Sequence, residues 1–503
     1  MSFLISFAVA FLLSCLLTPL MRRAAIPLGI VDHPDGRRKL QLGPIPLGGG
    51  VVVCVATILA IALNLGAMSL SAHGESKNPA DFLIGLLGAS VLIVAVGLLD
   101  DRFSLRGRQK LAGQLGAALI LVFSGLVVER IHLFGAQIEL GLLSIPFTLF
   151  WLLGAINALN LIDGIDGLAS SVGAILSVAI AGMAVMTGHG GDALIALALC
   201  GALLGFLIYN FPPASIYLGD AGSMLVGLLL GALAIRSSLK GPATVALAAP
   251  TVIWAIPIMD VGMAILRRKL TGRSIYHTDR GHLHHCLLRK GFSTRTTLIS
   301  IVIFCMVTAF GSLASVAQQN EWLAVGSALV VFATLLVTRW FGNAEFRLLG
   351  SRLKTLLVSL LKLSCGRKTP AIPVHTRITG TRDWDELWNT LTVYAERFDL
   401  CSVQFNVNLP AWNEDYHVQW NRKPEGDSHQ EWSTEFPLVT HNMTVGRLRI
   451  RGICMHDSVC VWMGELIAGL KPFETHLLAL LEEHIADKRR LDDALSPPES
   501  VTV

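Results

Sequence analysis

An apolar segment that ends in two aspartates indicates what kind of protein this chain is. Residues 144–171 have the sequence SIPFTLFWLLGAINALNLIDGIDGLASS. The run that ends at Ile162 is long enough to cross a bilayer, which takes about 20 helical residues. A second apolar run begins at Leu168, and Asp163 and Asp166 lie between the two. Because acidic side chains beside membrane spans are costly, they indicate a functional site.

The composition of the whole chain is that of a membrane protein. Of its 503 residues, 53% are hydrophobic and only 15% are charged, and the mean hydropathy is +0.59. Soluble globular chains carry about 25% charged residues, so a purely cytosolic enzyme is excluded. The nine cysteines form no evenly spaced framework, which excludes a disulfide-rich secreted scaffold.

Eleven apolar runs predict an all-α polytopic membrane protein with about 11 transmembrane helices. Arg22 and Arg23 follow the first run and no positive residue precedes it, so we expect a retained span rather than a signal peptide. Together the runs form a membrane domain over residues 1–340. The predicted spans are residues 2–21, 48–68, 81–99, 110–128, 144–162, 168–187, 191–208, 221–236, 245–266, 296–315 and 321–339.

The distribution of Lys and Arg predicts the orientation of these spans. The connections on one side carry 24 of these residues and those on the other side carry 4. Since cytoplasmic connections hold the excess of positive charge, the first set faces the cytoplasm. Eleven spans then place the N-terminus outside and the C-terminus inside.

The last third of the chain has the composition of a soluble domain. We expect a basic amphipathic interfacial helix over residues 341–365, a linker over 366–380, a small cytoplasmic α+β domain over 381–496 and a tail over 497–503. Within the domain, the pattern predicts helices near 383–397 and 472–490 and strands near 401–409, 415–421, 444–452 and 457–463. Its role is not predicted; a packing or oligomerisation module is favoured, which leaves a homodimer open.

Four polar segments fall on the side that the Lys and Arg count makes cytoplasmic. Three carry acids: Asp100 and Asp101 follow the third span, Asp163 and Asp166 the fifth, and Asp220 precedes the eighth. The fourth is the loop TGRSIYHTDRGHLHHCLLRKG after the ninth span. Because all four segments fall on the same side of the membrane, we expect them to form a single site. Carboxylates suit Mg²⁺, basic side chains suit a pyrophosphate, and Tyr217 offers a base a stacking face. Together they favour metal-assisted phosphoryl transfer from a nucleotide-activated donor to a lipid.

These segments, with VDHPDGRRKLQLGPIPLGGG near the start, resemble the polyprenyl-phosphate N-acetylhexosamine-1-phosphate transferases of glycosyltransferase family 4. The resemblance covers roughly residues 1–300. Its His-x-His-His form, at residues 282–285, is similar to the undecaprenyl-phosphate GlcNAc-1-phosphate transferase branch, whereas the MurNAc-pentapeptide branch carries a different histidine-rich loop. The resemblance implies a bacterial inner-membrane enzyme whose active site faces the cytoplasm and which initiates a cell-envelope polysaccharide.

The resemblance also implies a role for each candidate residue. Asp220 and Asn160 would hold Mg²⁺, with Mn²⁺ as an alternative ion. The four residues Asp100, Asp101, Asp163 and Asp166 are the catalytic candidates, the first two at the reacting phosphates. The substrate-binding candidates are Lys39 near the lipid phosphate or nucleotide, Gly164, Ile165, Asp166 and Asn210 at the uracil with Tyr217 stacked on it, and Arg280, His282, His284 and His285 at the pyrophosphate and sugar.

The implied partners are a UDP-sugar and polyprenyl phosphate, and no nucleic acid. A phosphate oxygen of the lipid would attack the sugar-bearing phosphorus and release UMP. The second pKa of a phosphate monoester is about 6, so the acceptor needs no strict base. Asp100 is therefore either a base or a positioning group, and direct displacement is favoured.

Other interpretations remain beside this one. The three histidines could form a zinc site, although only Cys286 is adjacent to them. Asp260 is expected to pair with Arg267 or another basic group, and Asp32 to lie in a turn. At the level of the whole protein, a transporter is the rival, but transporters place ionisable residues near mid-span. A MurNAc-pentapeptide transferase is the alternative within the family.

Overall fold

The computed structural model describes most of the chain and divides it into two compact units, Met1–Asn343 and Ala344–Val503. The described residues are 2–32, 44–64, 79–241, 244–246, 248–270, 281–342, 374–379, 383–398, 400–409, 414–422, 431–440, 443–453 and 466–480, with residues 346, 349 and 482.

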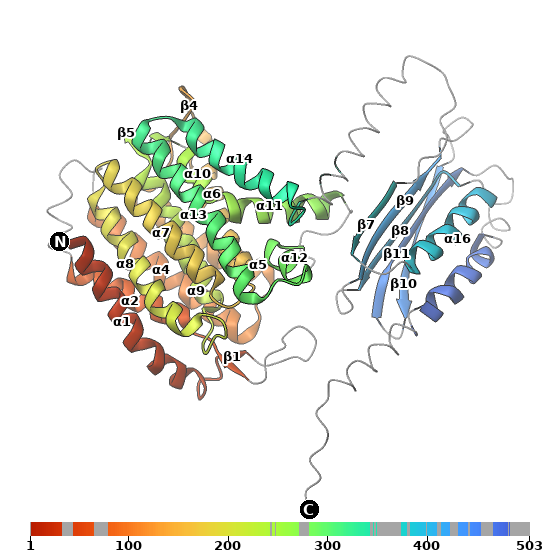
Figure 1. The fold of residues 1–503 in the computed structure, drawn as a ribbon, viewed down its shortest axis with the longest axis horizontal. Helices are drawn as coiled ribbons and strands as arrows, with labels where there is room; N and C mark the ends of the chain where they lie inside the picture. The colour runs from red at the N-terminus through yellow and green to blue at the C-terminus, as the bar shows by residue number, and fades with distance from the viewer. Residues whose placement is uncertain are drawn as a thin grey trace, which may run out of the picture. The chain divides into compact units, whose positions relative to one another are not determined.

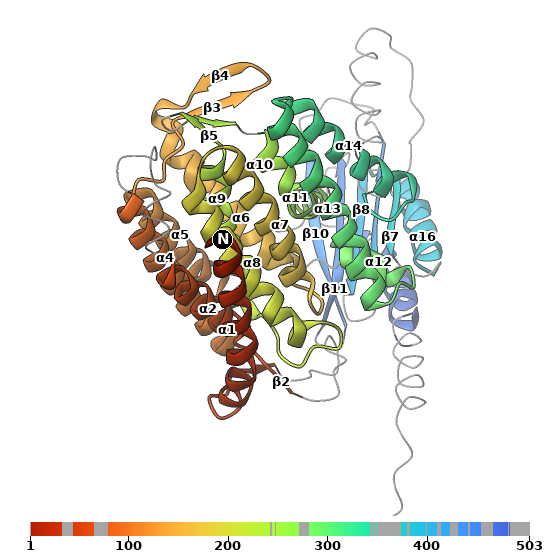
Figure 2. The same cartoon turned by 60° about the vertical axis from the view of Figure 1, so that its left-hand side comes forward.

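Unit 1 is a bundle of helices (Figures 1 and 2). Every residue of α9 except Asp220 is buried, so α9 forms the centre of the bundle. A Cβ on Gly97 of α4 would lie 2.2 Å from the backbone of Ala221, so the two helices touch backbone to backbone there. The helices are α1 (Ser2–Ala25), α2 (Gly49–Leu63), α4 (Pro79–Phe103), α5 (Gly107–Phe123), α6 (Ser144–Ile162), α7 (Leu168–Met186), α8 (Gly190–Asn210), α9 (Gly219–Ser237), α10 (Ala248–Ile253), α11 (Ala255–Leu270), α12 (Leu283–Arg289), α13 (Thr294–Gln318) and α14 (Glu321–Val337).

Among the described residues, seven helices are long and apolar enough to cross a membrane, namely α1, α4, α6, α7, α8, α9 and α13. The apolar helices α2 and α14 are shorter, and α5 has 17 residues. The helix expected to be continuous over 245–266 is interrupted at Trp254, the one residue between α10 and α11. Pro257 cannot donate a hydrogen bond to the carbonyl of Ile253, which breaks the helix at this point. The total of eleven spans and their orientation stay predictions.

The helices α4 and α9 run antiparallel, which separates two polar clusters. Asp101 near the end of α4 accepts a hydrogen bond from the backbone of Asp220 at the start of α9. Near the opposite ends, the Arg236 guanidinium lies 3.9 Å from the centroid of the Phe82 ring. Arg236 is also paired with buried Asp192 of α8 at 2.9 Å. The acid-rich end of the bundle is therefore the end opposite Arg236.

The membrane unit also contains short strands, which corrects the all-α prediction. The pair β1 (Val31–Asp32) and β2 (Ile45–Pro46) is antiparallel. A four-stranded sheet has the order β4-β3-β6-β5, formed by β3 (Arg130–Leu133), β4 (Ala136–Glu139), β5 (Leu239–Gly241) and β6 (Thr244–Ala246). Because β5 follows α9 directly, this sheet lies at the Arg236 end of the bundle.

Unit 2 is a five-stranded antiparallel sheet with helices on one face. The strands β7 (Val374–Thr379), β8 (Ser402–Leu409), β9 (Glu414–Asn421), β10 (Glu431–Thr440) and β11 (Met443–Ile453) have the order β10-β11-β8-β9-β7. The core contains Trp384 and Trp388 of α16 (Asp383–Arg397), Phe405 of β8 and Phe473 of the helical segment 466–480. Alternate residues of β8, such as Val403, Phe405 and Val407, face this core, as expected for a sheet with one covered face.

The α+β pattern expected for the C-terminal region is confirmed, with differences in detail. The helix near 383–397 and the strands near 401–409, 415–421 and 444–452 are present, whereas β10 was not predicted. The strand β7 lies inside the segment expected to be a linker, which corrects that expectation for residues 374–379. The strand near 457–463, most of the interfacial helix over 341–365 and the tail lie outside the described residues.

Candidate active site

A cavity of about 890 Å³ opens at the acid-rich end of the helical bundle. It lies where α4 and α6 end and where α9 begins. Nine of the predicted site residues line it: Asp100, Asp101, Asp163, Gly164, Ile165, Asp166, Asn210, Tyr217 and Asp220. Residues more than 100 positions apart in the chain are thus brought to one surface.

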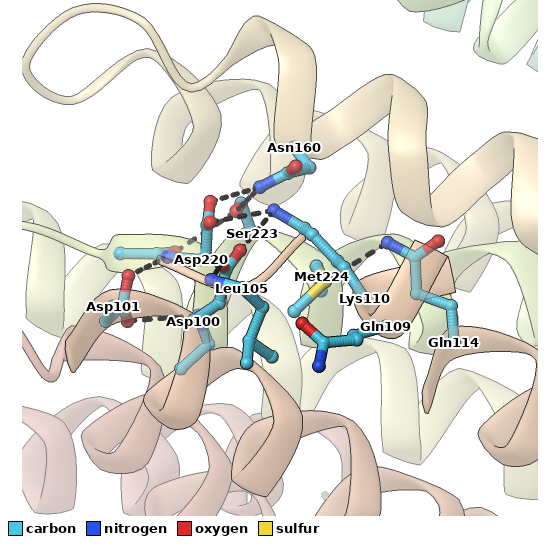
Figure 3. A network of polar contacts seen from close by, with 12 residues as sticks. Asp100, Asp101, Leu105, Gln109, Lys110, Gln114, Asn160, Asp220, Ser223 and Met224 are labelled. Carbon is cyan, nitrogen blue, oxygen red and sulfur yellow. Dashed lines mark hydrogen bonds and ion pairs between the residues drawn. The ribbon is translucent and has the colours of Figure 1, made fainter. Parts of the chain in front are cut away.

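A lysine that the sequence reasoning did not select joins two of these acids. Figure 3 shows the Lys110 side chain pointing from α5 toward Asp220 and Asp100. Its Nζ lies 2.7 Å from Oδ2 of Asp220 and 2.8 Å from Oδ2 of Asp100. The connection between α4 and α5 covers only residues 104–106, so the first turn of α5 must lie beside the last turn of α4. That short connection was the available signal for Lys110.

Asp220 is held from a second side by α6. Asn160 donates from Nδ2 to Oδ1 of Asp220 at 2.5 Å and to Oγ of Ser223 at 3.0 Å. The Ser223 hydroxyl in turn donates to the carbonyl of Gly219 at 3.1 Å. The two residues predicted to share a metal ion, Asp220 and Asn160, are therefore in direct contact.

Asp101 caps the helix that carries Asp220. Its Oδ1 accepts the backbone N–H of Asp220 at 2.8 Å, and its Oδ2 accepts that of Ala221 at 3.3 Å. The N–H groups of a first helical turn have no partner within the helix, so a carboxylate there is stabilising. Gly219 has φ +74, and a Cβ at this position would lie 2.6 Å from Oδ2 of Asp101. Asp101 therefore fixes the position of Asp220, a role not foreseen for it.

The loop between α6 and α7 brings Asp163 and Asp166 to the cavity. Asp166 accepts the backbone N–H of Ala214 at 2.9 Å, which ties this loop to the segment before α9. Burial, together with the nearby carboxylates of Asp220, Asp101 and Asp166, raises the pKa of Asp163 well above its usual range. Asp163 is therefore a carboxyl group that gives up its proton most readily when a cation is bound beside it.

Asn210 and Tyr217, two of the residues expected at the uracil, differ in what their side chains already contact. Asn210 accepts from the Ser170 hydroxyl at 3.0 Å and donates to the carbonyl of Ile216 at 3.0 Å. Both ends of its amide are thus used within the chain. Burial and the charges of Asp166 and Asp32 raise the pKa of Tyr217 to about 12, so its hydroxyl remains protonated.

The histidine motif lies beside the cavity rather than on its lining. A Cβ on Gly164 would lie 2.2 Å from Nε2 of His284, so the ring packs against the 163–166 loop. His284 is buried, and neither of its ring nitrogens has a hydrogen-bond partner among the described residues. Burial and the neighbouring His285 and His282 lower the pKa of His284 well below its usual range. His284 is therefore neutral, and its orphaned nitrogens fit a ligand at this edge of the cavity.

Some of the remaining predicted residues lie outside the described part of the chain, and some lining residues were not predicted. Lys39 and Arg280 lie outside the described residues. Asp32, expected to lie in a turn, lines the cavity from β1, and Ser104 and Thr294 line it without having been predicted. No set of three or more His, Cys, Asp or Glu side chains suited to a metal occurs among the described residues, so the zinc interpretation of the histidines gains no support.

The donor chemistry of the cavity fits a hard divalent cation. Mg²⁺ takes oxygen ligands and uses few carboxylates when a substrate phosphate supplies others. Asp220 and Asn160 offer a carboxylate and an amide in contact with each other. The Lys110 ammonium occupies the space between Asp100 and Asp220, which shows that this position accepts positive charge.

Comparison with known proteins identifies the family. The chain is 31% identical over 337 residues to the probable undecaprenyl-phosphate N-acetylglucosaminyl 1-phosphate transferase of Bacillus subtilis, which covers 66% of this chain and 89% of that protein. The family model described as glycosyl transferase family 4 matches residues 83–238, the stretch that carries all the acids at the cavity from Asp100 to Asp220. This chain belongs to glycosyl transferase family 4. It is a polyprenyl-phosphate N-acetylhexosamine-1-phosphate transferase family member.

Two other relatives show the range of the family 4 proteins that this chain matches. It is 34% identical over 343 residues to the decaprenyl-phosphate N-acetylglucosaminephosphotransferase of Mycolicibacterium smegmatis (63% of this chain, 83% of the relative). It is 30% identical over 332 residues to the phospho-N-acetylmuramoyl-pentapeptide-transferase of Clostridium perfringens (62% and 98%). Family 4 membership confirms the predicted family and favours an enzyme over the transporter considered from the sequence.

Proposed function

We propose that this enzyme transfers GlcNAc-1-phosphate from UDP-GlcNAc to undecaprenyl phosphate, with release of UMP, and so initiates a cell-envelope polysaccharide. The observation that carries the proposal is the convergence of Asp100, Asp101, Asp163, Asp166 and Asp220 on one cavity in a family 4 chain. The names of the Bacillus and Mycolicibacterium relatives favour GlcNAc as the sugar. The excess of Lys and Arg on the connections at this end supports a site at the cytoplasmic face of a bacterial inner membrane.

Asp220 and Asn160 would hold Mg²⁺, which when bound supplies positive charge to the diphosphate of the donor. Asp101 keeps Asp220 in place by capping α9. Lys110 balances the charge of Asp100 and Asp220 before the substrate arrives, and it is placed to pair with a phosphate oxygen afterwards.

The reaction balances as a displacement at phosphorus. An oxygen of undecaprenyl phosphate forms a bond to the phosphorus that bears the sugar, and the bond from this phosphorus to the oxygen of UMP breaks. Asp100 is buried and already bonded to the backbone N–H of Leu105 at 2.8 Å. A carboxylate held in this way is suited to orienting groups at the acceptor phosphate.

A transfer assay with a panel of donors tests the proposal. Membranes that contain the chain, undecaprenyl phosphate and Mg²⁺ are given UDP-GlcNAc, UDP-GalNAc or UDP-MurNAc-pentapeptide, and the lipid product is measured. We expect product from UDP-GlcNAc at the highest kcat/KM. Preference for UDP-MurNAc-pentapeptide would instead establish the alternative function within the family, the one named for the Clostridium relative.

A further inference from the structure

Asp260 on α11 is a buried carboxylate that contacts the start of the histidine motif. Its Oδ1 accepts the backbone N–H of Leu283 at 2.7 Å, and its Oδ2 lies 2.8 Å from Nδ1 of His282. Asp260 is 1% exposed and His282 is 6% exposed. Because little water reaches either group, this hydrogen bond is both strong and fixed in direction.

A second residue of α11 holds the same segment from the other side. Arg267 lies two turns after Asp260, and its Nη2 donates to the carbonyl of Gly281 at 2.9 Å. A Cβ on Gly281 would lie 1.5 Å from Nη1 of Arg267, so a side chain at this position would displace the guanidinium. The sequence analysis expected Asp260 to pair with Arg267 or another basic group, and the basic group that it contacts is His282, while Arg267 holds the carbonyl of Gly281 in the same segment.

The held segment continues directly into the contact with the cavity. His282 precedes α12, and two residues later the His284 ring packs against Gly164. The rings of His282 and His284 are nearly parallel, with centroids 6.1 Å apart. The position of the motif relative to the cavity loop is therefore set from α11.

We infer that Asp260 is a positioning residue of the transferase: it keeps a proton on Nδ1 of His282 and leaves Nε2 to contact the diphosphate of the sugar donor. A carboxylate only accepts, so the ring nitrogen that faces it must carry a hydrogen. Neither Asp260 nor His282 lines the cavity, and the histidine motif reaches its edge through His284, whose ring packs against the lining residue Gly164. Asp260 therefore acts through the motif that His282 begins. The inference rests on the proposed function, in which the histidine motif contacts the pyrophosphate.

The first test is a double-mutant cycle measured as kcat/KM for UDP-GlcNAc. Asp260→Asn should lower kcat/KM about 10–100-fold, as is typical when the group that orients a functional histidine is removed. If Asp260 acts through His282, the double variant Asp260→Asn, His282→Ala should fall no further than His282→Ala alone. The inference would be overturned if Asp260→Asn lowered kcat/KM by the same factor in the wild type and in His282→Ala. Full activity of Asp260→Asn would overturn it as well.

A second test leaves Asp260 unchanged and so does not depend on the folding of an Asp260 variant. The amide nitrogen of Asn lies close to where Nδ1 of histidine lies, so His282→Asn keeps the bond to Asp260 but has nothing in place of Nε2. We expect this variant to have the thermal midpoint of the wild type and to lose as much activity as His282→Ala. Wild-type activity in His282→Asn would show that Nε2 has no role.

The matched control removes another buried carboxylate far from the cavity. Asp192→Asn breaks the buried pair with Arg236 at the other end of the bundle. It should lower the thermal midpoint while kcat/KM per folded protein stays that of the wild type. The same loss of kcat/KM as in Asp260→Asn would mean that any buried charge disturbs the enzyme, which overturns the inference. A wild-type chain without transferase activity overturns the proposed function instead.

Discussion

The Nζ atom of Lys110 lies 2.7 Å from Asp220, although the two residues are 110 positions apart in the chain. The same nitrogen is 2.8 Å from Asp100, so one cation joins the end of α4 to the start of α9. Two neighbouring carboxylates that are shielded from solvent repel each other without such a group. The contacts of Lys110 with both acids therefore explain how Asp100 and Asp220, from separate segments, share one cavity.

Replacing Lys110 with methionine keeps the length of the side chain and removes its charge. We expect the variant to lose activity about 10²-fold, because a positive group aimed at the reacting phosphates is lost. The loss is measured as kcat/KM for UDP-GlcNAc. Arg108→Ala is the control, since Arg108 is an exposed residue two positions before Lys110 and does not line the cavity. Equal activities of the two variants would contradict the role of Lys110.

The cap that Asp101 forms on α9 predicts a difference between two substitutions. Asn accepts hydrogen bonds at a helix start nearly as well as Asp, whereas Ala costs about 1 kcal/mol there. We expect Asp101→Ala to have a lower thermal midpoint than Asp101→Asn and to lose more activity. If the carboxylate charge alone mattered, both variants would be equally inactive and equally stable. Thermal scanning in detergent and the transfer assay distinguish these outcomes.

The contact between Gly164 and His284 predicts that the cavity loop does not tolerate a methyl group. In Gly164→Ala the Cβ would meet the His284 ring, so either the loop or the ring must move. Displacements of about 1 Å can lower a rate about 10²-fold, and we expect a loss of this size in kcat. Gly154→Ala on α6 is the control, because nothing lies within 4 Å of its Cβ. A Gly164→Ala enzyme as active as the control would contradict the packing described.

The raised pKa of Asp163 predicts how Mg²⁺ binding depends on pH. A carboxyl group whose pKa is raised in the folded chain favours folding below its ordinary pKa, and this contribution is lost as the pH rises through the folded value. A bound cation reverses the effect, because it favours the ionised form. In the presence of EDTA we expect the thermal midpoint to fall as the pH rises from 6 to 8.5. The increase caused by Mg²⁺ should be larger at pH 8.5 than at pH 6, and an increase independent of pH would contradict the proposed site.

The division of the chain into two units predicts that transfer does not need the second unit. The described residues of unit 2 form their own sheet and hydrophobic core, and the described residues that line the cavity all belong to unit 1. A chain that ends at residue 343 should insert into membranes and keep the kcat/KM of the full chain in the transfer assay. Normal insertion with complete loss of activity would show that unit 2 takes part in catalysis.

The sequence predicted the cavity residues that lie at helix ends well. It predicted poorly the residues whose role depends on side-chain contacts with distant parts of the chain. The apolar runs place Asp100, Asp163 and Asp220 at span ends on one side of the membrane, because successive spans cross it in alternate directions. The pattern contains no information on which groups a side chain meets across the bundle. Lys110 and Asp260 were therefore missed as functional residues, since each contacts residues that are distant in the sequence or separated by a loop.

The fold was predictable to a similar extent. Long apolar runs such as 168–187 correspond to single helices, since hydrophobic length is sufficient to identify them. The run over 245–266 divides at Trp254 because a single proline outweighs the hydropathy of its neighbours. The short strands β3 and β6 were missed because their pairing joins segments that are 114 residues apart, from Arg130 to Thr244.

The exchange of radiolabelled UMP into UDP-GlcNAc tests the central claim most directly, because it requires the sugar-phosphate transfer to run in both directions at this cavity. With purified enzyme, undecaprenyl phosphate and Mg²⁺, we predict exchange that depends on the lipid and is abolished in Asp220→Asn, a variant that should accumulate in membranes normally. Exchange in Asp220→Asn at the wild-type rate would contradict the account.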